Sequence, residues 1–158
     1  RRTVIPVQEL LDAAGKYFKK LMKNRPERIE LEIESMEAKV IGDVNQLRFL
    51  LENLIDEALT VREDGVIRLQ ARKDNEYIRF LFTDTRREKS VEELNQLFYP
   101  NLARMTSGEK GELRGTEYLV CKQIIRDHDE FAGRRGCRIN AEPAEGGGFT
   151  VYFTIPRR

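Results

Sequence analysis

An apolar stripe at helical spacing, followed by two alternating strands, limits the folds that are open to this chain. The stripe joins Leu47, Leu50, Leu51, Leu54, Ile55, Ala58 and Leu59. Asp43 stands just before it, where a residue that caps a helix belongs. After the turn at Asp64-Gly65, residues 66–73 and 77–83 alternate apolar and polar side chains. This pattern predicts an antiparallel hairpin with one covered face, against which the helix can pack.

The other segments extend this pattern of helices lying on a largely antiparallel sheet. The remaining expected helices span residues 7–22, 91–98 and 115–128, and the remaining expected strands span residues 29–33, 38–41, 137–142 and 149–155. The order of the elements separates the helices from the strands. It predicts an α+β fold, a two-layer α/β sandwich whose mixed, mostly antiparallel sheet is covered by helices on one face.

Length and charge favour a single globular domain over residues 1–158. The chain has 158 residues and a formal net charge of +1, so no overall field favours nucleic acid or a membrane surface. No apolar run reaches membrane-spanning length, and two cysteines without metal-ligand spacing suit a reducing cytoplasm. Because the chain opens on Arg1, we expect a domain excised from a longer protein.

Five short motifs then follow one another in a meaningful order. They are Asp43-x-x-Gln46-Leu47-Arg48 through Ala58, Phe82-Thr83-Asp84-Thr85, Leu97-Phe98-Tyr99-Pro100, Lys122-Gln123-Ile124-Ile125, and Gly146-Gly147-Gly148 through Pro156. In this order they resemble the N box, first glycine box, phenylalanine box, post-glycine-box helix and closing hairpin of sensor histidine kinases. The chain is therefore identified as similar to their ATP-binding domain, the Bergerat-type fold shared with gyrase-type and Hsp90-type ATPases.

The resemblance implies a nucleotide pocket with named residues. Asp84 matches the aspartate that accepts the adenine amino group, although an aspartate after a strand also commonly bonds local backbone. Glu57 stands where the family has an asparagine that helps to coordinate Mg²⁺, and Asn53 lies one turn earlier. Glu57 could ligate Mg²⁺ through carboxylate oxygen; alternatively, both residues are solvated at the helix edge.

Several positions depart from the family pattern. Gly115, followed by Thr116, is the one glycine of the second box that remains in a segment expected to grip phosphate. The glycines expected in the two boxes are replaced by Arg86, Glu88, Leu113 and Glu117, and Phe149 stands where a threonine is common near adenine. Long or acidic side chains crowd the nucleotide and oppose anion binding at a helix N-terminus. We therefore expect that ATP and Mg²⁺, the cofactors the family implies, are not bound in the ordinary way.

Two further groups of residues invite chemical hypotheses. Basic side chains beside the pocket segments could hold another anion or could simply be a solvated rim; they are Arg86, Arg87, Arg104, Lys110 and Arg114. His128, the one histidine, ends a predicted helix. In the family the phosphoacceptor histidine lies on a separate helical hairpin, so we expect His128 to favour the helix dipole or to pack in the core.

The resemblance implies a role in bacterial two-component signalling in the cytoplasm. We expect a degenerate histidine-kinase-like domain with no catalytic residues of its own, acting as a regulatory or protein-interaction module. Its implied partners are the dimerisation and phosphotransfer helices of the parent protein and a response-regulator receiver domain, bound through residues 97–114 and the helix from residue 115. The alternatives are an active kinase catalytic domain that binds Mg·ATP in an altered pocket and an anti-sigma-type serine kinase relative.

Overall fold

The computed structural model describes residues 1–100 and 116–158. The helices are α1 (Val7–Met22), α2 (Val44–Ala58), α3 (Val91–Asn95) and α4 (Glu117–Phe131). The strands are β1 (Thr3–Pro6), β2 (Ile29–Ile33), β3 (Lys39–Gly42), β4 (Gly65–Asp74), β5 (Tyr77–Asp84), β6 (Ile139–Pro143) and β7 (Phe149–Pro156). Within these residues, no helix combines the length and apolarity that crossing a membrane requires.

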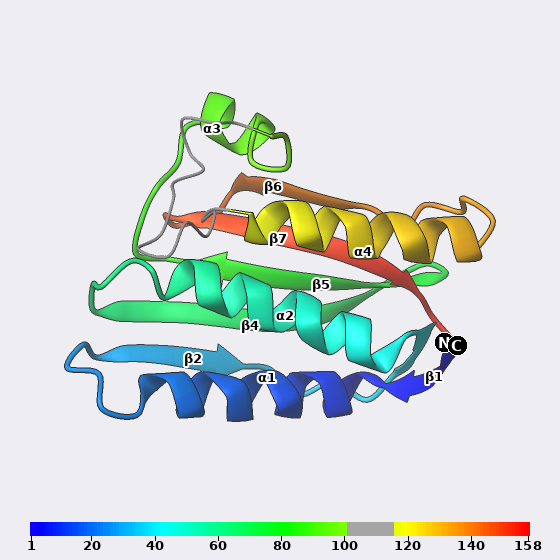
Figure 1. The fold of residues 1–158 in the computed structure, drawn as a ribbon, viewed down its shortest axis with the longest axis horizontal. Coiled ribbons are helices and arrows are strands. Elements are labelled where there is room, and N and C mark those ends of the chain that lie inside the picture. Colours follow the sequence, from blue (N-terminus) through cyan, green and yellow to red (C-terminus); the bar gives the residue numbers. More distant parts are fainter. Residues whose placement is uncertain (101–115) are drawn as a thin grey trace, which may run out of the picture.

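A five-stranded sheet of order β2-β4-β5-β7-β6 forms one layer of the fold. The pair β2–β4 is parallel and the other three pairs are antiparallel. Helices α1, α2 and α4 lie across one face of this sheet, and α3 sits beyond its β6 edge (Figure 1). The predicted α+β sandwich, with helices on one face, is confirmed.

The core lies between the helices and the central strands. Alternate residues of β4, β5 and β7 point toward the helices and are buried, as the period of two requires. Phe80 and Phe153 stack there with ring centroids 4.8 Å apart. Helix α2 begins as predicted, because Asp43 Oδ1 accepts a hydrogen bond of 2.9 Å from the backbone N–H of Gln46.

Both ends of the chain are held by the short strand β3. It pairs with β1 in a separate two-stranded sheet, and Val40 forms a bridge with Arg157. The N-terminal and C-terminal residues consequently lie side by side (Figure 1). The sequence pattern did not predict β1, which lies directly before α1.

Two predicted helices differ in their limits. Helix α3 ends at Asn95 rather than residue 98, and α4 continues to Phe131 rather than residue 128. After α3, Leu97 and Phe98 are buried without being helical, and the Phe98 ring meets the Tyr118 ring edge-on at 5.6 Å. Leu97 and Phe98 are therefore apolar because the segment packs in the core, where Phe98 contacts α4, and not because it is helical.

Candidate functional site

The carboxylate of Asp84, the expected adenine acceptor, lies at the end of β5 and is already bonded. Asp84 is 4% exposed. Its Oδ1 accepts hydrogen bonds from the backbone N–H and the Nε of Arg86, at 3.0 and 2.9 Å. Its Oδ2 accepts from Nη2 of the same side chain at 2.9 Å. The local backbone bond agrees with the expectation that an aspartate after a strand bonds its own backbone, and a bidentate ion pair accompanies it. The adenine contact stays a prediction.

The guanidinium of Arg86 uses its remaining donors on the chain that follows α2. Nη2 donates to the Ala58 carbonyl at 2.6 Å, and Nη1 donates to the carbonyls of Val61 and Glu63, each at 2.9 Å. A guanidinium has five N–H donors, and all five are paired. The side chain is 1% exposed. The expectation of a solvated basic rim is therefore wrong for Arg86, which is a buried clasp between β5 and the end of α2.

Two glycines allow the chain to close tightly around this clasp. Gly65 has φ +143°, and a Cβ there would lie 2.6 Å from Cγ of Arg86. Gly148 has φ +84°, and a Cβ there would lie 2.1 Å from the Asp84 carbonyl oxygen. Only glycine tolerates both the close approach and these dihedral angles. At Gly65 and Gly148, the absence of a Cβ makes room for the Arg86 side chain and the Asp84 backbone.

The N-box residues on α2 take different positions. Asn53 is 7% exposed, and its Nδ2 donates to the Phe49 carbonyl, 2.7 Å away and one turn back on the same helix. Glu57, four residues later, is half-buried. A solvated helix edge is therefore wrong for Asn53, whose amide group is engaged within the helix.

The N-terminus of α4 carries a second carboxylate, that of Glu117, which acts together with Glu57 on Cys121. Glu117 lies in the first turn, and its Oε2 is buried without a hydrogen-bond partner among the described residues. Burial raises the pKa of the Cys121 thiol, and the nearby charges of Glu117 and Glu57 raise it further. Both carboxylates thus lie close enough to Cys121 for their charges to act on it. They add negative charge around Cys121, near the N-terminus of α4.

The remaining predicted pocket residues are dispersed or lie outside the described residues. Thr116 occupies the N-cap position of α4 but makes no side-chain capping bond. Phe149 is buried and pairs in register with Asp84. Arg87 is exposed and pairs with Glu63 at 2.6 Å. The predictions for Gly115, Arg104, Lys110, Leu113 and Arg114 concern residues that the structure does not describe.

These residues do not fit Mg·ATP in the usual manner. Each Asp84 oxygen that would accept from adenine already accepts from Arg86. Glu57 and Glu117 repel phosphate, although their oxygens suit a hard cation. Across residues 1–100 and 116–158, no three His, Cys, Asp or Glu side chains gather as metal ligands.

The buried imidazole of His128 is a core group. Its Nε2 accepts from the backbone N–H of Asp43 at 3.1 Å, so its Nδ1 carries the proton and donates to the Ile124 carbonyl at 2.8 Å. Burial lowers the pKa of His128, and the charge of Arg2 lowers it further. Of the two expectations for His128, core packing agrees with this geometry, because both ring nitrogens are engaged.

Comparison with known proteins then identifies the fold family. Residues 42–158 match the family of histidine kinase-, DNA gyrase B- and HSP90-like ATPases, and the chain belongs to this family. A search of curated proteins gives no match.

Solved structures agree with this family at the level of the fold. The catalytic domain of histidine kinase ThkA is similar, with 21% identity over 99% of this chain and 96% of that chain and a TM-score of 0.76. The mycobacterial sensor histidine kinase MprB is similar at 18% identity over 100% and 99% of the two chains, with a TM-score of 0.74. A structure of ThkA in complex with the response regulator protein TrrA matches at 18% identity over 99% of this chain and 42% of that one, with a TM-score of 0.72.

The Arg86 clasp is the feature of the site that sequence reasoning missed. The pattern Asp84-Thr85-Arg86 revealed a bulky residue at a glycine position, two residues after the expected adenine acceptor. That spacing lets the side chain fold back onto the carboxylate, which was the available signal. The three carbonyls could not be anticipated, because their positions depend on the turn after α2.

Proposed function

We propose that this chain is a degenerate histidine-kinase-type ATP-binding domain in which ATP binding is impaired or lost. It serves a two-component signalling protein as a regulatory or protein-interaction module and has no catalytic residue of its own. The observation that carries the proposal is the Arg86 guanidinium. It pairs with both oxygens of Asp84, and its three remaining N–H groups donate to backbone carbonyls.

The cost of opening this clasp explains the loss. Asp84 is 4% exposed and both of its oxygens accept from Arg86, so adenine would have to compete with Arg86 for this carboxylate, and breaking a buried ion pair costs about 3–5 kcal/mol. Since each 1.4 kcal/mol is a tenfold change in affinity, the penalty is roughly a hundredfold to several thousandfold. The carboxylates of Glu57 and Glu117 add repulsion toward phosphate.

The proposed partners follow from the family. They are the dimerisation and phosphotransfer helices of the parent protein and a response-regulator receiver domain, in the cytoplasm of a bacterium. The complex of ThkA with the response regulator protein TrrA supports the second partner. The fold is retained for such contacts, with no role in binding nucleic acid or membrane.

A second candidate is an active histidine kinase catalytic domain. It would bind Mg·ATP in an altered pocket, with Asp84 at adenine and Glu57 at Mg²⁺, and would phosphorylate a histidine on a separate helical hairpin. The buried Oε2 of Glu117, which has no hydrogen-bond partner within residues 1–100 and 116–158, favours this candidate, because a cation would satisfy that oxygen.

Calorimetric titration with Mg·ATP and Mg·ADP separates the two candidates. We expect no heat of binding at millimolar nucleotide for the wild-type chain and for Asp84→Asn. Micromolar binding that Asp84→Asn abolishes would refute the proposal and establish the active kinase domain. Arg86→Gly, checked by circular dichroism, is expected to gain measurable ADP binding because it empties the space beside Asp84.

A further inference from the structure

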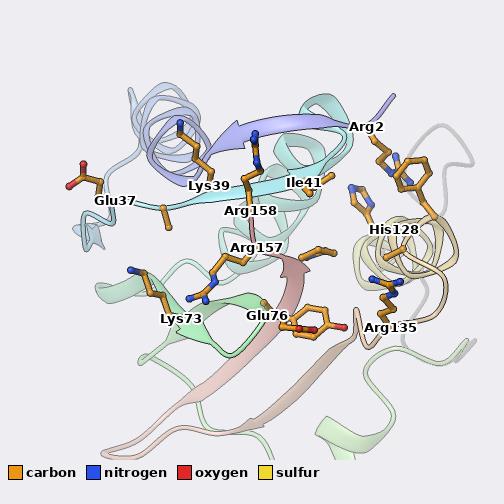
Figure 2. A pocket seen from close by; sticks show the side chains of 15 residues that line it. Arg2, Glu37, Lys39, Ile41, Lys73, Glu76, His128, Arg135, Arg157 and Arg158 are labelled. Carbon is orange, nitrogen blue, oxygen red and sulfur yellow. The ribbon is translucent and has the colours of Figure 1, made fainter.

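A second pocket lies at the opposite end of the sheet from Asp84. It has a volume of about 750 Å³, within the usual range of small-molecule sites. Strand β5 links the two regions, since Asp84 ends the strand and Tyr77, which begins it, lines the pocket. Segments that are distant in sequence meet there: β1, β3, the β4–β5 turn, the end of α4 and the C-terminal residues (Figure 2).

Positive charge gathers around this pocket from five separate segments. The cationic lining residues are Arg2, Lys39, Lys73, Arg135, Arg157 and Arg158. Only two acidic side chains, Glu37 and Glu76, join them. Figure 2 shows Lys73 and Arg157 on one side of the pocket, and Arg135 below His128 on the other.

These cations are largely uncompensated. Within residues 1–100 and 116–158, neither Glu37 nor Glu76 forms an ion pair, and Arg2 is the one cation of the six with a carboxylate within 4.0 Å, at 3.9 Å from Asp43. Elsewhere on the surface, arginines pair with neighbouring carboxylates, as Arg72 does with Glu34 at 2.6 Å. Like charges held close together repel, and an anion between them would relieve that repulsion.

Apolar side chains also line the pocket. They include Ile41, Pro156, Tyr77 and Phe131, and the guanidinium carbon of Arg2 lies 4.9 Å from the centroid of the Phe131 ring. Apolar walls with a few convergent charges are typical of a site for a ligand that has an apolar body and an anionic group.

We propose that this pocket binds a small amphiphilic anion, with an aromatic or similarly apolar body and a phosphate or carboxylate group. The body rests on Ile41 and Tyr77, and the acidic group lies on the side of the pocket that carries Lys73 and Arg157. The site shares no residue with the Asp84 end of the sheet, so a test of this pocket does not depend on the proposed function.

Chemical-shift mapping of the isotope-labelled chain with 1-naphthyl phosphate tests the proposal. We expect saturable binding, with the largest shifts at Tyr77, Ile41 and Arg135. Neutral 1-naphthol lacks the anionic group, and inorganic phosphate lacks the apolar body. Each is therefore expected to bind at least about tenfold more weakly than 1-naphthyl phosphate. Higher salt should weaken binding of 1-naphthyl phosphate, since screening acts on exposed charges.

Charge reversal supplies the matched control. The double variant Lys73→Glu/Arg157→Glu should weaken binding of 1-naphthyl phosphate by at least about tenfold, from the loss of charge-assisted bonds. Lys20→Glu, on the exposed face of α1, should change the affinity by less than about twofold.

Three results would overturn the assignment. Shifts from 1-naphthyl phosphate that do not saturate, or that map elsewhere on the wild-type chain, would refute the site whether or not the variants fold. Equal affinity for inorganic phosphate would refute the apolar half of the ligand. Binding of poly-glutamate without binding of 1-naphthyl phosphate would instead assign the surface to an acidic protein partner.

Discussion

Removing the Arg86 side chain should destabilise the fold strongly, because it leaves a buried carboxylate without its partner. Arg86 and Asp84 have side chains that are 1% and 5% exposed. Breaking such a pair by removing one member costs about 3–5 kcal/mol. For a domain of this size, this corresponds to a fall in the melting temperature of roughly 6–20 °C.

A double-mutant cycle measures this coupling directly. Arg86→Met, Asp84→Asn and the double variant would be unfolded in urea and followed by circular dichroism. We expect the double variant to lose less than the sum of the single losses, with a coupling energy of about 2–3 kcal/mol. The neighbouring exposed pair of Arg87 with Glu63 is the control, and Arg87→Met should cost at most about 1 kcal/mol. If the losses at Arg86 and Asp84 are additive, the two side chains are not coupled. That result would refute the clasp and leave the Asp84 carboxylate available to adenine.

Three further measurements test other parts of the structure. Burial lowers the pKa of His128 below its ordinary value of 6.5, so the unfolded chain takes up a proton before the folded chain does as pH falls. Stability to urea should therefore decline below about pH 6.5, and His128→Gln should flatten that decline. Gly148→Ala should cost more than about 2 kcal/mol in thermal unfolding, because its Cβ would strike a backbone carbonyl of β5, whereas Gly146→Ala, with similar φ and open space, should cost about 1 kcal/mol; equal losses would contradict the contact. Burial raises the pKa of the Cys121 thiol, and it raises the pKa of the Cys137 thiol to about 11. Both should therefore resist a disulfide reagent in the folded chain and react in urea, and fast labelling of the native chain would contradict their burial.

Local patterns were sufficient to predict most of the fold. The apolar stripe of α2 and the alternation in β4 and β5 each follow from one period along one segment, so their type and order could be read directly. The parallel pairing of β2 with β4 could not, because a strand's alternation does not record the direction of its neighbour. Strand β1 was also missed, because its pairing with β3 depends on the tertiary fold.

The candidate site was harder to predict than the fold. A lost glycine at Arg86 suggested crowding, but the direction of a long side chain depends on contacts with the turn after α2. The basic pocket left no signal in the sequence at all. Its cations are spread from Arg2 to Arg158, and only the topology of the sheet brings them together.

The arrangement of the chain ends around β3 has a mechanical consequence. Load applied between residues 1 and 158 enters through β1 and β7, and the short strand β3 joins the two through its pairing with β1 and the Val40–Arg157 bridge. This small joint carries the tension before the central strands do, so it should be the first part of the molecule to give way under force. Since Lys39 and Arg157 belong to both the joint and the basic pocket, a molecule bound in that pocket would raise the force needed to part the ends.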